Sequence, residues 1–174
     1  VSVILEHRWL YDIEEEVKKF PLGPVGIFEP EIVRHGKDIT VVAVSWMVVE
    51  ALKAAEVMSR LHGIEIEVID MRTTHRLIGI NVMRSVCKTG YCITADYDWL
   101  GGYMTEVAHQ VHGQCWGKLK APVDRIGFAD EHCPTARHLE DEFYPNAISI
   151  IESAEIMLDL KEKDLSGEEF YSYE

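Results

Sequence analysis

The sequence has few positive charges and no long apolar run. Lysine and arginine number 17 against 30 aspartates and glutamates, which gives a formal net charge of -13. Nucleic-acid binders carry a basic stripe, and anionic membrane surfaces attract basic segments, so we expect neither nucleic acid nor a membrane as a partner. No stretch approaches the roughly 18 apolar residues of a membrane span, and no signal peptide is recognisable.

The sequence also lacks any cysteine framework. Its four cysteines are Cys87, Cys92, Cys115 and Cys133, and no two of them form a C-x-x-C pair. This pattern matches neither a disulfide scaffold nor a zinc finger. We therefore predict free thiols and a reducing, cytoplasmic setting.

Two nucleotide-binding fingerprints are missing. A dinucleotide fold needs G-x-G-x-x-G after its first strand, but here that turn contains Trp46 and Met47 and no glycine. Their side chains would keep a pyrophosphate away from the backbone. The phosphate-binding pattern G-x-x-x-x-G-K-[ST] is absent as well. A stand-alone NAD-dependent redox enzyme and a P-loop enzyme are therefore not expected.

What the chain does contain is a regular alternation of strand and helix patterns. Residues 39–45 are apolar and β-branched, as in a strand buried on both faces, and residues 47–62 switch to helical spacing. Gly63 and Gly90 end helices, and Asn146 caps one. The predicted strands are 2–6, 39–45, 64–71, 91–96 and 122–129. The predicted helices are 47–62, 79–88, 102–114, 136–143 and 147–162. Such alternation predicts a parallel sheet between two helical layers, an α/β/α fold.

The organisation along the chain predicts one core unit without an internal repeat. The chain starts at Val1 directly in a strand pattern, which suggests a fragment of a longer polypeptide. Residues 1–31 are expected to be a strand and a linker from a preceding domain. Residues 32–163 form the predicted α/β domain, and residues 164–174, without apolar periodicity, form a loose tail.

Five residues at predicted strand ends are candidates for anion or partner contact: Ser45, Arg72, Thr73, Gly101 and Gly102. Open α/β sheets bind ligands at this edge, where helix starts expose free amides. Each residue also has a structural interpretation. Ser45 caps a helix, and Arg72 pairs with Asp70 or a helix end. Gly101 and Gly102 make a tight turn that needs positive φ.

Clusters of histidine, cysteine and acidic residues also suggest chemistry. His109, His112 and Cys115 share one helical face, but zinc needs a fourth ligand, so packing is the simpler interpretation. The same holds for a second group of His132, Cys133 and His138. A third group, Asp96, Asp98 and Glu106, lacks the known separation that a carboxylate pair needs. We assign no catalytic, cofactor-binding or metal residue.

Short segments across residues 1–158 occur in a specific order. They are 6–11 (EHRWLY), 34–42 (RHGKDITVV), 50–52, 54–56, 63–64, 67–73, 85–86, 88–90, 101–103 with Glu106, 121–123, 125–126, 133–134, 139–140 and 144–145. Together they resemble the C-terminal domain of the E1β subunits of 2-oxoacid dehydrogenases, relatives of transketolase and deoxyxylulose-phosphate synthase. VIDMRT at 68–73 is the most specific. The family's Pro-Leu-Asp is replaced by residues 77–79, and a family glycine by Met104.

The resemblance implies a five-stranded, mostly parallel sheet with one antiparallel strand. It also implies that thiamine diphosphate and magnesium are held by a preceding pyrimidine-binding domain and by the α subunit. This domain would then serve assembly in a homo- or hetero-oligomer, with the E1α subunit and the subunit-binding domain of E2 as partners. Its parent would be an oxidoreductase, and the domain alone would be inactive.

Two alternatives remain open. The parent is a transketolase or synthase, or the domain is regulatory and binds a phosphorylated metabolite through Arg72. The segment EHRWLY favours the E1β type.

Overall fold

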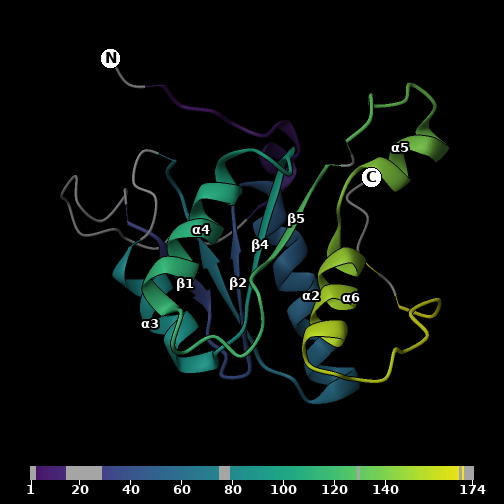
Figure 1. Ribbon diagram of the computed structural model, residues 1–174. Coiled ribbons are helices and arrows are strands. Elements are labelled where there is room, and N and C mark those ends of the chain that lie inside the picture. Colours follow the sequence, from purple (N-terminus) through teal and green to yellow (C-terminus); the bar gives the residue numbers. More distant parts are fainter. Residues whose placement is uncertain (1–2, 15–28, 75–78, 129, 169, 171–174) are drawn as a thin grey trace.

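Five strands form one sheet in the order β1-β3-β2-β4-β5 in the computed structural model of Figure 1. The structure describes residues 3–14, 29–74, 79–128, 130–168 and 170. β2, β3, β4 and β5 run parallel, and β1 pairs with β3 in the antiparallel direction. The strands are β1 (Glu31–Arg34), β2 (Ile39–Ala43), β3 (Ile66–Asp70), β4 (Cys92–Trp99) and β5 (Asp124–Phe128). The predicted five-stranded, mostly parallel sheet is confirmed.

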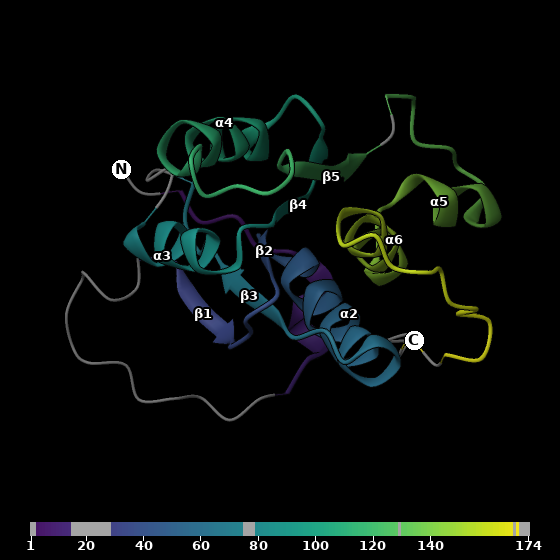
Figure 2. The ribbon, with the colours of Figure 1, turned by 60° about the horizontal axis from the view of Figure 1, so that its bottom comes forward.

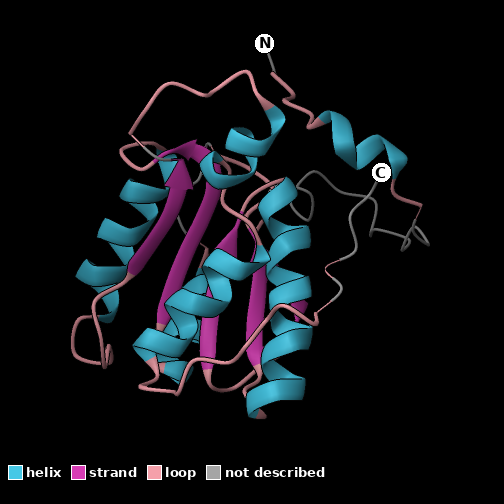
Figure 3. Cartoon of the chain, turned by 90° about the vertical axis from the view of Figure 1, so that its right-hand side faces the viewer, coloured by secondary structure: helices cyan, strands magenta, loops and turns pink. Residues whose placement is uncertain are grey.

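Two pairs of helices cover the two faces of this sheet. α2 (Trp46–His62) and α6 (Ala147–Met157) pack on one face, and α3 (Ile80–Thr89) and α4 (Tyr103–Cys115) pack on the other. Figures 2 and 3 show the three layers. The other described helices are η1 (Arg8–Asp12), a 3-10 helix, and α5 (Arg137–Phe143). No helix in these ranges is long and apolar enough to span a bilayer.

The central strand β2 explains why both faces need cover. All five of its residues are buried. Val41 and Ala43 pack with α2 and α6, whereas Val42 packs with α3 and α4. Because successive side chains of a strand point to opposite faces, a continuous apolar run requires a helical layer on each side.

The prediction of a strand at residues 2–6 is wrong for its described part. Residues 3–6 form no strand, and Val3, Ile4 and Leu5 are 80%, 81% and 88% exposed. The fifth strand is instead β1, whose Ile32 lies opposite Ile69 of β3. A strand forms where its backbone groups find a partner. β1 has such a partner in β3, and residues 3–6 have none within the described chain.

The last long helix is shorter than predicted. α6 ends at Met157, whereas helical spacing suggested about residue 162. Asp159 adopts a left-handed φ of 52°, and the N–H of Leu160 donates to the carbonyl of Glu155 across 2.9 Å. This is the hydrogen-bond pattern of a Schellman stop. The turn lets Leu160 pack back on the α2–α6 core, a tertiary contact that spacing along one helix does not reveal.

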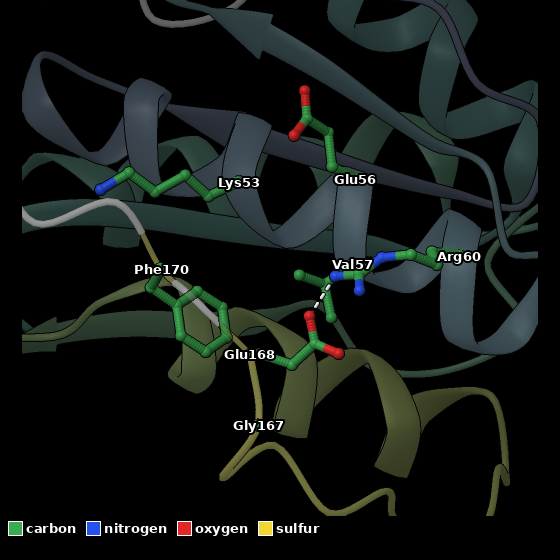
Figure 4. Close-up of a pocket in the computed structure, with 7 residues that line it drawn as sticks. All are labelled: Lys53, Glu56, Val57, Arg60, Gly167, Glu168 and Phe170. Atoms are coloured by element: carbon green, nitrogen blue, oxygen red, sulfur yellow. Dashed lines mark hydrogen bonds and ion pairs between the residues drawn. The ribbon is translucent and has the colours of Figure 1, made fainter.

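The chain after α6 lies against α2. Leu165 and Phe170 pack on the core of α2 and α6, and Glu168 forms an ion pair with Arg60. Arg60, Glu168 and Phe170 border a cavity of about 410 Å³, and Figure 4 shows its lining side chains. Its lining residues are Lys53, Glu56, Val57, Arg60, Gly167, Glu168 and Phe170. In the predicted tail, Leu165, Glu168 and Phe170 thus contact the domain, while residues 169 and 171–174 lie outside the described chain.

The start of α6 supplies a direct test of the local folding rules. Asn146 accepts hydrogen bonds from the N–H groups of Ile148 and Ser149, and the Ser149 hydroxyl accepts the N–H of Asn146, which completes a capping box. We expect Asn146→Ala to lower the free energy of unfolding by about 1 kcal/mol. Asn146→Asp, which keeps an acceptor, should retain most of it. Urea denaturation measures both variants, and equal losses would contradict the capping role.

Candidate functional site

Three neighbouring parallel strands bring the predicted site residues to one edge of the sheet. β3, β2 and β4 lie side by side and run in the same direction, so their carboxyl ends coincide. Arg72 and Thr73 follow β3, Ser45 follows β2, and Gly101 and Gly102 follow β4. In an open parallel sheet this is the edge at which ligands usually bind.

Hydrogen bonds tie the loops of this carboxyl edge to one another. The N–H of Met71 donates to the carbonyl of Ala43 across 3.0 Å, which links the end of β3 to β2. The hydroxyl of Tyr103, the first residue of α4, donates to the carbonyl of Thr73 across 3.3 Å. The loop after β3 is therefore held from both sides.

Two residues at this edge have unusual backbone conformations. Ser45 and Arg72 both have φ of 56°, a region that residues other than glycine seldom adopt. Around Arg72 the N–H of Thr73 donates to the carbonyl of Met71 across 2.5 Å, which makes a tight three-residue turn. Ser45 occupies the N-cap position of α2, but its side chain makes no cap hydrogen bond. Strained residues of this kind tend to gather at functional sites.

The guanidinium of Arg72 lies among carboxylates of its own chain. It forms an ion pair with Glu31 of β1, and its Nε lies 4.0 Å from Oδ2 of Asp70. The N–H of Arg72 also donates to Oδ1 of Asp70 across 2.9 Å. Burial raises the pKa of Asp70, a change that this hydrogen bond opposes, and burial lowers the pKa of Arg72. An external anion would have to compete with Glu31 for the guanidinium.

A second carboxyl at the edge has a shifted pKa. Burial, reinforced by the nearby charge of Asp98, raises the pKa of Asp96 from 3.8 to about 6. Burial, with a smaller contribution from Asp96, raises the pKa of Tyr103 to about 12. Of the predicted acidic group, Asp96 and Asp98 lie close together, whereas Glu106 is exposed and accepts a hydrogen bond from Gln110. Shifts of this size in a half-buried carboxyl are frequent at functional sites.

The two glycines after β4 lie close to neighbouring side chains and do not have positive φ. Gly102 has φ of -77°, and Gly101 is not among the residues with positive φ. A Cβ on Gly102 would collide with the carboxylate of Asp98, and a Cβ on Gly101 would collide with the ring of Trp99. The expected positive-φ turn is therefore corrected to a close approach of side chains to the backbone.

An aromatic cluster that the sequence reading missed covers the same edge. His7 stacks on Trp46 with ring centroids 5.8 Å apart, and Trp9 meets Trp46 edge-on at 5.2 Å. Tyr97 of β4 contacts the rings of both His7 and Trp9. The sequence contains one weak signal for this cluster, which is an aromatic residue near the end of several strands. Tyr97 also contacts Phe128 of β5.

His7 stands out within this aromatic cluster. Its Nδ1 is buried and has no hydrogen-bond partner among the described residues. Burial lowers the pKa of His7. A buried polar atom without a partner costs free energy, which makes the Nδ1 of His7 a candidate contact for a group outside the described residues.

The histidine clusters have structural explanations. His112 places Nδ1 3.0 Å from the carbonyl of Ala108, and its Nε2 accepts the N–H of Val123 across 3.2 Å. His132, Cys133 and His138 lie exposed around α5. Within the described ranges, no three histidine, cysteine or acidic side chains are grouped so that they could hold a metal ion.

The fold is a three-layer α/β domain. The edge formed by the carboxyl ends of its strands carries aromatic and acidic side chains, and His7 and Trp9 of the N-terminal segment pack there. The family model of the transketolase C-terminal domain matches residues 29–150. The chain therefore belongs to the transketolase C-terminal domain family. Its Met104, where we expected a family glycine, is 5% exposed and packs in the core of α3 and α4. Residues 75–78, which include most of the other departure, lie outside the described chain.

Three relatives illustrate the similarity, and all three are β subunits. The chain is 34% identical over 154 residues to the β subunit of acetoin:2,6-dichlorophenolindophenol oxidoreductase of Cupriavidus necator, covering 87% of this chain and 45% of that protein. It is 37% identical to the mitochondrial pyruvate dehydrogenase E1 β subunit of Pisum sativum (87% and 43%) and 35% identical to that of Homo sapiens (86% and 43%). The chain thus spans less than half the length of these relatives.

A solved structure shares the fold. A split-gene transketolase, described as an inactive β4 tetramer, superposes with a TM-score of 0.60 at 26% identity, covering 78% of this chain and 44% of that one. The family match and this shared fold agree.

Proposed function

We propose that this chain is the C-terminal assembly and partner-docking domain of a thiamine-diphosphate enzyme of the 2-oxoacid dehydrogenase E1β type. The observation that carries the proposal is the packing of His7 and Trp9 on Trp46 at the carboxyl edge, in a chain with E1β relatives. This contact ties the N-terminal segment to the domain. In our proposal the domain uses this contact to hold a preceding domain and its partner subunits together in one enzyme.

The exposed N-terminal segment supports an attachment to a preceding domain. Val3, Ile4 and Leu5 are each at least 80% exposed. Three adjacent exposed apolar side chains favour contact with another protein surface that would cover them. In our proposal residues 1–31 belong to the junction with a preceding pyrimidine-binding domain. Residues 32–163 are the domain itself, and residues 164–174 its tail. The unpartnered Nδ1 of His7 would find a donor or acceptor at this junction.

The carboxyl edge suits a protein partner better than the cofactor. The diphosphate of thiamine diphosphate needs cations or free amides. Here Asp96 and Asp98 lie beside each other, and the guanidinium of Arg72 pairs with Glu31. The residues present therefore do not fit the cofactor. We propose that thiamine diphosphate and magnesium are held by the preceding domain and by an E1α subunit.

Charge supports a basic partner. The net charge of -13 would steer a basic module such as the subunit-binding domain of E2 towards the chain. We propose E1α and E2 as partners in a homo- or hetero-oligomer. The four free cysteines suit a reducing compartment, and we propose the cytoplasm. Cell fractionation tests that location, since the pea and human relatives are mitochondrial subunits.

Two titrations test the proposal. We expect the purified chain to show no heat of binding with thiamine diphosphate and magnesium, and no decarboxylation of any 2-oxoacid. Turnover by the chain alone would contradict it. We expect a basic E2 subunit-binding domain to bind the chain at low salt and to bind more weakly as salt is added. Absence of binding at low salt would remove the docking role and leave the assembly role.

A transketolase or deoxyxylulose-phosphate synthase parent is the second candidate, favoured by the structural likeness to the split-gene transketolase. The third is a regulatory domain that binds a phosphorylated metabolite through Arg72. Titration with inorganic phosphate separates it from the others. Saturable binding that Arg72→Met abolishes would support the regulatory domain.

A further inference from the structure

Two cysteines from neighbouring helices place their sulfur atoms together. Cys87 lies in the last turn of α3, and Cys115 is the final residue of α4. Their Sγ atoms are 3.3 Å apart, although the residues are 28 positions apart in the sequence. Met83 of α3 adds a third sulfur 3.9 Å from Sγ of Cys115. α3 and α4 thus share a sulfur-rich contact at their carboxyl ends.

The two thiols differ in access. Cys87 is exposed, whereas Cys115 is 1% exposed. Burial, together with the hydrogen bond and charge of Cys87, raises the pKa of the Cys115 thiol to about 12. A reagent in solution therefore reaches Cys87 first. Cys115 is shielded from the same reagent and lies within reach of whatever forms on Cys87.

The other two cysteines lack this arrangement. Cys92 lies near Cys115 but is completely buried on β4, and burial, with a contribution from the charge of Cys115, raises its pKa. Cys133 is exposed, and its sulfur lies 3.5 Å from the hydroxyl of Tyr144, which is not a thiol. Cys133 is therefore a matched control, being an exposed cysteine beside a polar neighbour that cannot resolve a mixed disulfide.

We propose that Cys87 and Cys115 form a reversible dithiol–disulfide site that low-molecular-weight disulfides oxidise. The Cys87 thiolate attacks the reagent RSSR, forms a mixed disulfide and releases one RS⁻. The Cys115 thiol then loses its proton to solvent or to RS⁻, and its sulfur attacks Sγ of Cys87. A Cys87–Cys115 bond forms and a second RS⁻ leaves. Two protein thiols are oxidised, and one RSSR is reduced to two RSH.

The geometry allows this bond with a small movement. A disulfide bond is about 2.05 Å long, so the sulfurs must approach by somewhat more than 1 Å from their present contact. Both cysteines lie in the last turn of a helix, where the backbone adjusts more readily than in the middle. The bond would join α3 to α4, the two helices on one face of the sheet.

Oxidised glutathione is the probe for the test. The whole chain is incubated with it, quenched with acid and analysed by intact mass and peptide mapping. We expect Cys133 to gain one glutathione, and Cys87 and Cys115 to appear as one linked peptide lighter by two hydrogen atoms. Dithiothreitol should reverse both changes. We also expect the linked protein to unfold about 5 °C higher, because the cross-link restricts the unfolded chain.

Single replacements separate the two steps. Cys115→Ser should keep glutathione on Cys87, because the resolving sulfur is gone. Cys87→Ser should leave Cys115 unmodified, and Cys133→Ser should form the internal link as the wild type does. A stable glutathione adduct on Cys87 of the wild type, an unmodified Cys87, or a link between two chains would each overturn the proposal. These outcomes do not depend on the docking function.

Discussion

Replacement of Gly36 by alanine is expected to lower the free energy of unfolding by about 3 kcal/mol or more. A Cβ at this position would lie well inside van der Waals contact with the backbone of Ile66 and Glu67, which cannot rotate away as a side chain can. Gly36 lies in the turn between β1 and β2, and its carbonyl accepts a hydrogen bond from Lys88 across 2.7 Å. The clash would therefore push this turn away from the start of β3. Urea denaturation measures the loss.

Gly113 supplies the matched control for Gly36→Ala. It lies inside α4, and a Cβ there would meet nothing within 4 Å. Gly113→Ala should raise the free energy of unfolding by about 0.5–1 kcal/mol, because alanine is the better helix former. A similar loss in both variants would mean that the close approach at Gly36 is not what makes the glycine necessary.

Asp96→Asn is expected to stabilise the chain at neutral pH. Burial and the charge of Asp98 raise the pKa of Asp96 from 3.8 to about 6 in the folded state. Two pKa units correspond to about 3 kcal/mol, which partial access to solvent reduces to about 2 kcal/mol. At pH 7 the folded chain must keep this carboxyl ionised in an unfavourable place. Asparagine removes that cost.

The sign of the pH dependence follows from the same pKa shift. Well below pH 4 the carboxyl is protonated in both states, so Asp96 imposes no cost and the variant gains nothing. Between about pH 4 and 6 the unfolded state loses its proton first, and the wild type loses stability as the pH rises. Above about pH 6 the gain of Asp96→Asn is complete. Urea denaturation at pH 4 and pH 7.5 measures the difference.

Asp130 provides the control for this effect. Asp130→Asn, at an exposed position, should change the free energy of unfolding by less than about 0.5 kcal/mol at either pH. A gain for Asp96→Asn that is the same at pH 4 and pH 7.5 would contradict the titration argument. Titration of the Asp96 carboxyl followed by carbon NMR checks the pKa directly.

A carboxyl that lowers stability suggests a role other than folding. Proteins commonly keep such groups where function requires them. Asp96 lies at the carboxyl edge beside Tyr103, whose hydroxyl donates to the carbonyl of Thr73. We therefore regard it as a candidate contact for the protein partners proposed above. Loss of E2 binding in Asp96→Asn, with stability gained, would support that role.

The regular core of the fold was predictable because it depends on local patterns. The run 39–45 read as a strand buried on both faces, and β2 is buried at all five positions. Helical spacing over 47–62 predicted α2 to within one residue, and Gly63 ends it with φ of 67°. A helix buried on one face and a strand buried on both faces each have a characteristic spacing of apolar residues. This spacing therefore predicted the order of strands and helices along the chain.

The candidate site was only partly predictable, because its chemistry depends on neighbours that are distant in the chain. Strand ends placed Ser45, Arg72 and Gly102 at one edge. The ion pair of Arg72 with Glu31 depends on β1, whose four residues carry little pattern of their own. The stacking of His7 on Trp46 likewise joins positions 39 residues apart.

The sequence by itself determined the layered α/β class, the order along the chain of β2–β5 and their helices, and the family to which the chain belongs. These follow from apolar periodicity, glycine stops and ordered motifs, which act over a few residues. Only the tertiary structure decided that β1 is the antiparallel strand and that Asp96 is half-buried beside Asp98. It also brought Cys87 within 3.3 Å of Cys115. Strand pairing, desolvation and sulfur contact are properties of surfaces that meet in space, and no local pattern records them.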